Sequence, residues 1–138
     1  MSDSKHVIQG TLAEWVPVLR EMLPDYGEFA ATLLVGCESP DERVAEHPIT
    51  AVEVDEHGAE INLCADPDAA AALTVSALMV RLEALPTRYS GYHLYSAAPR
   101  RELADGVEIR ADAPIVNVVV DAIGRRVGFV GEGVRLDS

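Results

Sequence analysis

The residues that could do chemistry in this sequence are few and widely spaced. Cys37 and Cys64 do not form a C-x-x-C pair, and no G-x-S-x-G motif provides a nucleophilic serine. The glycine-rich stretch Gly128–Gly133 leaves no room for the helix whose N-terminus a phosphate-binding loop requires. We therefore expect no catalytic residues, no cofactor and no nucleotide site.

Histidines lie near carboxylates at two places. His57 and Glu60 are separated by a turn that leads into a strand, so they do not share a helical face. His47 lies near three acids, Asp41, Glu42 and Glu46. Neither spacing fixes the ligand geometry of a metal ion. We expect no metal site here, and a solvated acidic loop from Glu38 to Pro48.

The strongest signal is the distribution of acidic residues. The net charge is −12, and residues 38–68 contain ten acids against one base, Arg43. Nucleic-acid binding depends on Lys and Arg that neutralise phosphates, so nucleic acid is excluded as a partner. A surface of one sign speeds encounter with a surface of opposite sign, so a basic protein is the expected partner. The alternative is that the acidity only keeps the protein soluble.

Two groups of residues are the candidates for contact with such a partner. The first group is acidic and lies in the loop 38–48 and the turn 55–58; it comprises Glu38, Asp41, Glu42, Glu46, Asp55 and Glu56. The second group lies in Tyr89–Ala97, which alternates as a strand with Tyr92 and Leu94 toward the core. Its outer face would then carry Tyr89, His93 and Tyr95, and aromatic residues are frequent anchors of interfaces.

Hydrophobic periodicity predicts the elements that position these groups. Thr11 and Glu14 match a capping box at the start of a first helix, whose apolar residues include Trp15 as a core anchor. A second helix is predicted over Asp66–Pro86, with Asp66 as its N-cap and with both its bulky face and its alanine-rich face covered. The predicted strands are 28–37, 49–54, 59–64, 89–97, 107–110, 115–120 and 127–130.

Two details of the strand 59–64 matter for the candidate surface. Ile61 and Leu63 alternate with Glu60 and Asn62, so the polar pair is expected to face water. In the turn before this strand, Gly58 is expected to take the left-handed conformation.

The order of the elements predicts an α+β fold for one domain spanning residues 1–138. Helices and strands do not alternate, which disfavours a Rossmann-type fold. We expect an antiparallel or mixed sheet of about six strands with two helices packed on one face, in the order α-β-β-β-α-β-β-β.

The function expected from these observations is that of a small, acidic protein-binding domain, an inhibitor such as an immunity protein that masks a basic partner. The first ten residues lack the apolar core of a signal peptide, which predicts a cytoplasmic location, and the helix 66–86 is too polar to span a membrane. Ten arginines against one lysine suggest a bacterial source.

Two alternatives stay open. One is a ligand-binding or enzymatic domain with a pocket near Arg81, Tyr92 and His93. The other is a homo-oligomer, such as a homodimer, that uses the alanine-rich face 69–84 or the edge of the strand 115–120.

Overall fold

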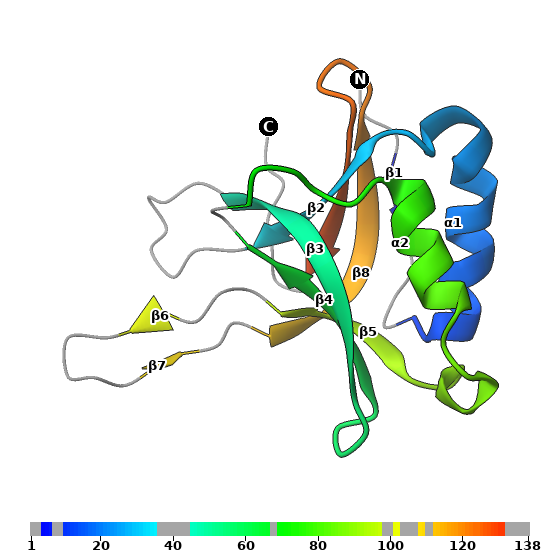
Figure 1. Ribbon diagram of the computed structural model, residues 1–138, viewed down its shortest axis with the longest axis vertical. Helices are drawn as coiled ribbons and strands as arrows, with labels where there is room; N and C mark the ends of the chain where they lie inside the picture. Colours follow the sequence, from blue (N-terminus) through cyan, green and yellow to red (C-terminus); the bar gives the residue numbers. More distant parts are fainter. Residues whose placement is uncertain are drawn as a thin grey trace.

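Two helices, α1 (Leu12–Tyr26) and α2 (Val75–Glu83), lie side by side next to a sheet (Figure 1). This computed structural model describes residues 4–6, 10–35, 45–66, 69–97, 101–102, 108–109 and 112–131. A short 3₁₀ helix, η1 (Thr87–Tyr89), follows α2. The strands are β1 (Ser4–His6), β2 (Ala30–Val35), β3 (Ala45–Asp55), β4 (Glu60–Ala65), β5 (His93–Ala97), β6 (Arg101–Glu102), β7 (Glu108–Ile109), β8 (Asp112–Asp121) and β9 (Arg126–Gly131).

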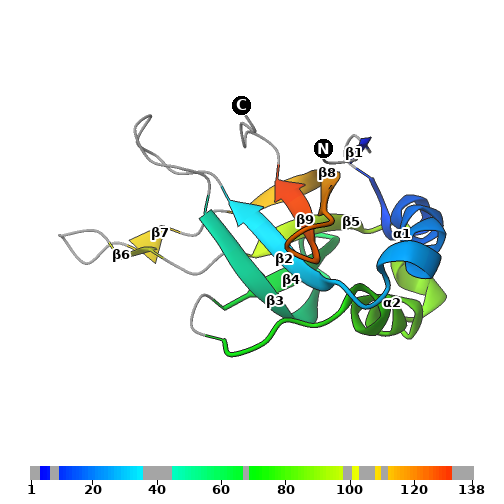
Figure 2. The same ribbon diagram turned by 90° about the horizontal axis from the view of Figure 1, so that it is seen from above.

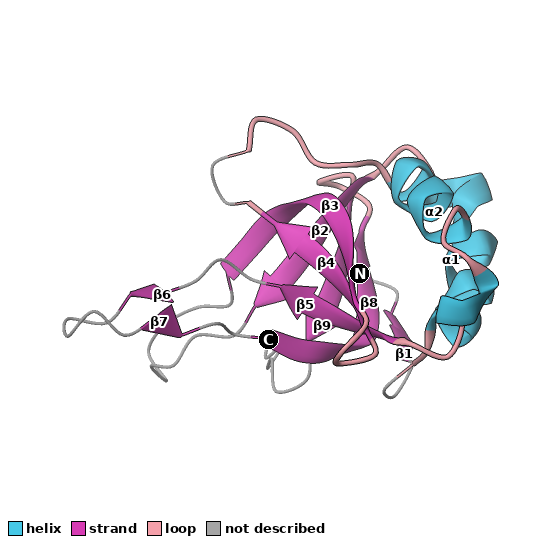
Figure 3. Cartoon of the chain, turned by 60° about the horizontal axis from the view of Figure 1, so that its bottom comes forward, coloured by secondary structure: helices cyan, strands magenta, loops and turns pink. Residues whose placement is uncertain are grey.

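The main sheet is mixed and has seven strands in the order β1-β8-β5-β4-β3-β2-β9. Strand β9 also pairs with β8, so every strand of this sheet except β1 belongs to a closed cycle of pairings (Figure 2). Strands β6 and β7 form a separate two-stranded sheet. The pairs β2–β9 and β4–β5 are parallel, and the other pairs are antiparallel. Both helices lie on one side of these strands (Figure 3). The predicted α+β fold with a mixed sheet is confirmed.

Helix α1 begins where the capping box predicted. The Thr11 side chain accepts a hydrogen bond from the Glu14 N–H, and the Glu14 carboxylate accepts one from the Thr11 N–H at 3.2 Å. The bond from the Thr11 N–H satisfies a backbone donor at the start of the helix, and the Glu14 N–H also donates to the Thr11 carbonyl at 3.0 Å. The apolar stripe of the helix is buried: Leu12, Trp15, Leu19 and Met22.

Helix α2 is shorter than predicted, and Asp66 is not its N-cap. The helix begins after Thr74, whose side chain accepts from the Ala77 N–H at 3.1 Å. Before it, the Leu73 N–H donates to the Ile49 carbonyl at 2.9 Å, and the Leu73 carbonyl accepts from the Ala31 N–H at 2.8 Å. These bonds to β3 and β2 hold the chain extended, so tertiary pairing overrides the helix propensity of the alanines.

The two faces of α2 differ in burial. The bulky face is buried as predicted, at Val75, Leu78, Met79 and Leu82. The second face was expected to be covered as well, but Val80 is 67% exposed and Ala84 is exposed. The packing of α1 beside α2 therefore covers only part of this face.

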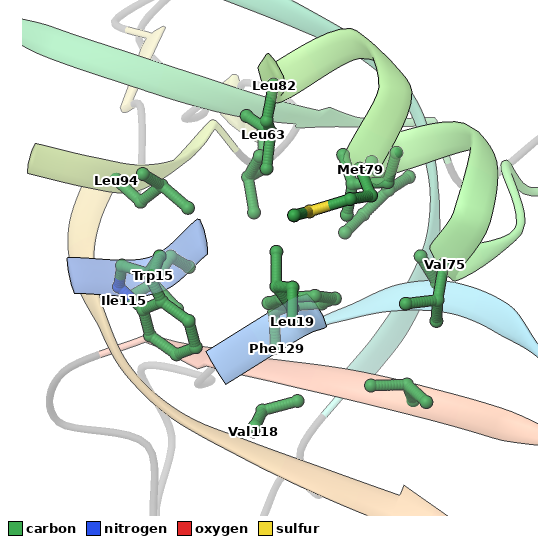
Figure 4. Packing of buried hydrophobic residues seen from close by; sticks show 14 of the residues in the cluster. Trp15, Leu19, Leu63, Val75, Met79, Leu82, Leu94, Ile115, Val118 and Phe129 are labelled. Atoms are coloured by element: carbon green, nitrogen blue, oxygen red, sulfur yellow. The ribbon is translucent and has the colours of Figure 1, made fainter. Parts of the chain in front are cut away.

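The core lies between the helices and the strands (Figure 4). Trp15 is fully buried, as predicted, and its ring lies 6.1 Å from that of Phe129 in β9. Its indole Nε1 has no hydrogen-bond partner among the described residues. Around this pair gather apolar side chains from both helices and from six strands.

Several predicted strand limits are corrected. Residues 45–48, expected in a loop, open β3, and the expected strand over 89–97 begins only at His93. The hairpin of the last two strands is confirmed as β8 and β9. Strand β8 pairs with β9 along one side and with β5 and β1 along the other, so the edge proposed for a homodimer is occupied there.

Candidate functional site

The β3–β4 hairpin carries the acidic turn, and its tip is the lowest point of the view in Figure 1. Asp55 Oδ1 accepts hydrogen bonds from the backbone N–H groups of His57 (3.1 Å) and Gly58 (3.2 Å). The left-handed residue is Ala59, with φ 54°, and not Gly58 as expected. Ala59 directly precedes β4, so the left-handed residue lies at the end of the turn, one position after Gly58.

Glu56, at the tip, joins a cluster with the residues that follow α2. The Tyr89 hydroxyl donates to Glu56 Oε1 at 2.5 Å, and Arg88 Nη2 donates to the Tyr89 oxygen at 2.6 Å. Arg88 Nη2 also lies 3.4 Å from Glu56 Oε1, and its guanidinium lies 4.8 Å from the centroid of the Tyr89 ring. The hydrogen bond with Tyr89 is the main cause that raises the pKa of Arg88 above its usual value. Glu56 of the predicted acidic group and Tyr89 of the predicted aromatic group therefore contact each other.

Tyr89 is not on an outer sheet face, which corrects the sequence-based expectation. It is 7% exposed, lies in η1 and packs against Tyr92 with ring centroids 5.0 Å apart. Turn hydrogen bonds explain the difference, because the Tyr89 N–H donates to the Pro86 carbonyl and the Tyr92 N–H donates to the Tyr89 carbonyl. The other two expected anchors, His93 and Tyr95, are half-buried on β5.

Strands β3, β4 and β5 bring polar residues into register on the face opposite the core. Glu53, Asn62 and Tyr95 are direct neighbours across the three strands. The next row holds Asp55, Glu60 and His93. The intervening residues Ile61, Leu63 and Leu94 are fully buried in the core, which places these two rows on the other face. We call this face, with its six polar residues, the polar face.

Exposure varies across the polar face. Glu53 and Asp55 are exposed, so their carboxylates are open to solvent. Asn62 was expected to face water, but it is only 6% exposed, so that expectation is wrong. Its position in β4, between β3 and β5, explains the burial, because neighbours flank it on both sides.

Glu46 lies in β3 and is bonded within the chain. Its Oε2 accepts from the Thr32 hydroxyl at 2.9 Å, and its Oε1 forms an ion pair with Arg126. Three other predicted partner-binding acids, Glu38, Asp41 and Glu42, lie outside the described residues. Of the acidic group, the structure thus places Asp55 and Glu56 at the hairpin tip and Glu46 in an internal network.

The same network extends to Asp121 at the end of β8. Arg126 Nη2 lies 2.7 Å from Asp121 Oδ2, and the Gly124 N–H donates to Asp121 Oδ1 at 2.9 Å. The hydrogen bonds from Gly124 and Arg126 lower the pKa of Asp121, and the bond to Asp121 raises that of Arg126. Arg126 therefore pairs with two carboxylates, those of Glu46 and Asp121, and offsets part of their negative charge.

Sequence reasoning missed Glu53, Asn62 and Arg126 as members of these groups. The alternation of β4 identified the face that carries Asn62, but no local signal gave the strands on either side of it. A better signal existed for Arg126, because Asp121-x-x-Gly124 repeats the spacing of Asp55-x-x-Gly58. That repeat predicts a second hairpin turn over 121–124, and the sequence places Arg126 just after this turn.

Arg81, which the pocket hypothesis used, is exposed on α2. Within the described ranges, no group of three or more His, Cys, Asp or Glu side chains could hold a metal ion. No helix in the described part of the chain is long and apolar enough to cross a membrane.

Comparison with known proteins gives no relative. No family model matches the chain, and neither a curated protein nor a solved structure is significantly similar to it.

Proposed function

We propose that this protein is an acidic protein-binding domain, an inhibitor of the immunity type that masks a basic protein partner. One observation carries the proposal: the projecting β3–β4 hairpin presents the exposed acids Glu53, Asp55 and Glu56, which we call the hairpin acids. Residues 45–66 contain six acids and no Lys or Arg. A surface of this kind attracts a basic protein and favours its docking in one orientation.

Two of the hairpin acids, Asp55 and Glu56, are held in defined positions, which supports binding over mere solubility. Asp55 is fixed by two backbone N–H groups, and Glu56 by Arg88 and the Tyr89 hydroxyl. A carboxylate that is already ordered loses less conformational entropy when it meets its partner. Acids that serve only solubility need no such constraint.

Two of the remaining predicted contacts lie on the strand beside this hairpin. His93 and Tyr95 lie on the polar face beside β4, where they can supply apolar contact next to the charges. Glu38, Asp41 and Glu42 belong to the segment that precedes β3 and add negative charge to the same proposal. The proposal also includes a bacterial source and action in the cytoplasm, and cell fractionation tests the latter.

The test compares two charge-reversal variants of equal net charge. The acid-reversed variant is Asp41→Lys, Glu42→Lys and Glu53→Lys. The control variant is Glu21→Lys, Asp25→Lys and Glu28→Lys, which changes three exposed acids on α1 and just after it. Each immobilised protein is exposed at low salt to the soluble proteins of its source cell, and retained proteins are identified.

We expect the wild type and the control variant to retain the same basic protein, and the acid-reversed variant to lose it. Raising the ionic strength shortens the range of charge attraction and should release the partner from the wild type. Retention of no basic protein, or equal retention by both variants, would refute the proposal.

A further inference from the structure

Asn62 carries a buried acceptor that no described residue satisfies. The residue is 94% buried, since its exposed fraction is 6%, and its Oδ1 has no hydrogen-bond partner among the described residues. Buried polar atoms in native proteins almost always have a partner, so an exception indicates a bound water or a ligand. The partner of an amide oxygen must be a hydrogen-bond donor.

The neighbours of Asn62 define which donor suits the site. Glu53 of β3 and Tyr95 of β5 lie directly across from it in register, and adjacent strands are about 4.8 Å apart. Glu53 is exposed, and Tyr95 is half-buried. The three side chains therefore offer a carboxylate, an amide oxygen and an aromatic ring on one face of the sheet.

We infer that this site receives an arginine side chain of the basic partner. The guanidinium would donate one N–H to Asn62 Oδ1 and another to the Glu53 carboxylate, and its plane would lie on the Tyr95 ring. Arginine presents five donors in a planar fork and stacks on aromatic rings, whereas the lysine ammonium is a compact, strongly hydrated charge. This inference rests on the proposed function and names the side chain that the polar face recognises.

The same combination already occurs within the chain. Arg88 lies over the Tyr89 ring at 4.8 Å, donates to its hydroxyl and pairs with Glu56 of the β3–β4 turn. Glu53 and Tyr95 provide the carboxylate and the ring, and Asn62 adds an acceptor that has no partner among the described residues. An arginine of the partner would make with Tyr95 and Glu53 the ring and carboxylate contacts that Arg88 makes with Tyr89 and Glu56.

The test uses two synthetic peptides of equal length and charge, one with alternating Arg and Gly and one with alternating Lys and Gly. Binding to the ¹⁵N-labelled protein is followed by NMR at low salt. We expect about tenfold tighter binding of the arginine peptide, the gain of one hydrogen bond to a charged donor, with shifts at the Asn62 side-chain amide.

The variant Asn62→Leu tests the arginine site separately from the proposed function. It should remove the tenfold preference, leave the charge-driven binding common to both peptides, and raise the melting temperature because an unpaired buried acceptor is gone. Tyr95→Leu, which deletes the ring but keeps the Asn62 side chain and an apolar neighbour beside it, should also reduce the preference.

Three results would overturn the inference: equal affinities of the two peptides, an unchanged preference in Asn62→Leu or in Tyr95→Leu, or an Asn62 amide that does not respond to the arginine peptide. The last result would indicate that a bound water alone satisfies Oδ1. The proposed function fails separately, when the acid-reversed variant retains the basic partner as well as the control variant does.

Discussion

Removing the Glu46 carboxylate tests how the structure divides its acids between stability and binding. Glu46 was predicted to contact a partner, but it lies in β3 with 27% of its side chain exposed. It accepts from Thr32, which is 5% exposed, and forms an ion pair with Arg126, which is 46% exposed. The variant Glu46→Ala removes both interactions.

The expected loss follows from the two contacts. The ion pair is partly exposed, so it contributes about 0.5 kcal/mol. The hydrogen bond from the buried Thr32 hydroxyl to a charged acceptor contributes about 1.5 kcal/mol, at the low end of the usual range because Thr32 also lies 3.4 Å from the Val127 carbonyl. We expect Glu46→Ala to lower the free energy of unfolding by about 2 kcal/mol.

Urea unfolding followed by the fluorescence of the single tryptophan, Trp15, measures this loss, because that ring is fully buried in the native state. With a slope of about 2 kcal/mol/M, the midpoint should fall by about 1 M. The matched control is Glu53→Ala, an exposed acid on the same strand, whose effect should stay within about 0.5 kcal/mol. Equal midpoints for the two variants would refute the internal role of Glu46.

Three further predictions concern the turns and the core. Ala59→Gly relieves a left-handed φ of 54° and should raise the free energy of unfolding by about 0.5 kcal/mol, measured by urea unfolding; a loss of stability would contradict this. Trp15→Ala should lower the free energy of unfolding by about 4 kcal/mol, measured by circular dichroism, whereas Trp15→Phe should cost clearly less, because it keeps an aromatic ring beside Phe129 and leaves a smaller cavity; equal losses would contradict that reading. Asp121 has a lowered pKa in the fold, so its stabilisation is present above its ordinary pKa of 3.8 and is lost as the pH falls through the lower value. Asp121→Asn should therefore reduce the dependence of the melting temperature on pH in this acidic window, and an identical pH profile would count against the contact.

Local signals predicted the parts of the fold that depend on local interactions. The capping box at Thr11 and Glu14 forms as predicted, because both of its hydrogen bonds lie within one helical turn. The apolar stripe of α1 and the two hairpins follow from periodicity and turn residues for the same reason. The α+β class follows from the order of these elements.

The wrong predictions depend on contacts distant in sequence. The chain before α2 stays extended because Leu73 bonds to β2 and β3, which its own sequence does not indicate. Tyr89 is buried because η1 packs against the β3–β4 turn, and its hydroxyl reaches Glu56. Asn62 shows the same limit, since alternation fixes its face but not its neighbours Glu53 and Tyr95.

For the candidate site too, the sequence predicted some properties and not others. Its charge could be predicted, because net charge and clustering are properties of the sequence alone. Its composition could not, because Glu46 turned out to be neutralised by Arg126, while Glu53, which no motif distinguishes, stands exposed on the polar face. The acid count therefore indicated a candidate segment, and the strand register shows which of its residues are neighbours.

The central claim is that the acidic surface around the β3–β4 hairpin binds a basic protein. The most direct measurement is the Kd of the retained basic partner for the wild type, the acid-reversed variant and the control variant, each over a series of salt concentrations. We expect tight, salt-sensitive binding by the wild type and the control variant, and weak binding with little salt dependence by the acid-reversed variant. The same Kd and the same salt dependence for all three proteins would contradict it.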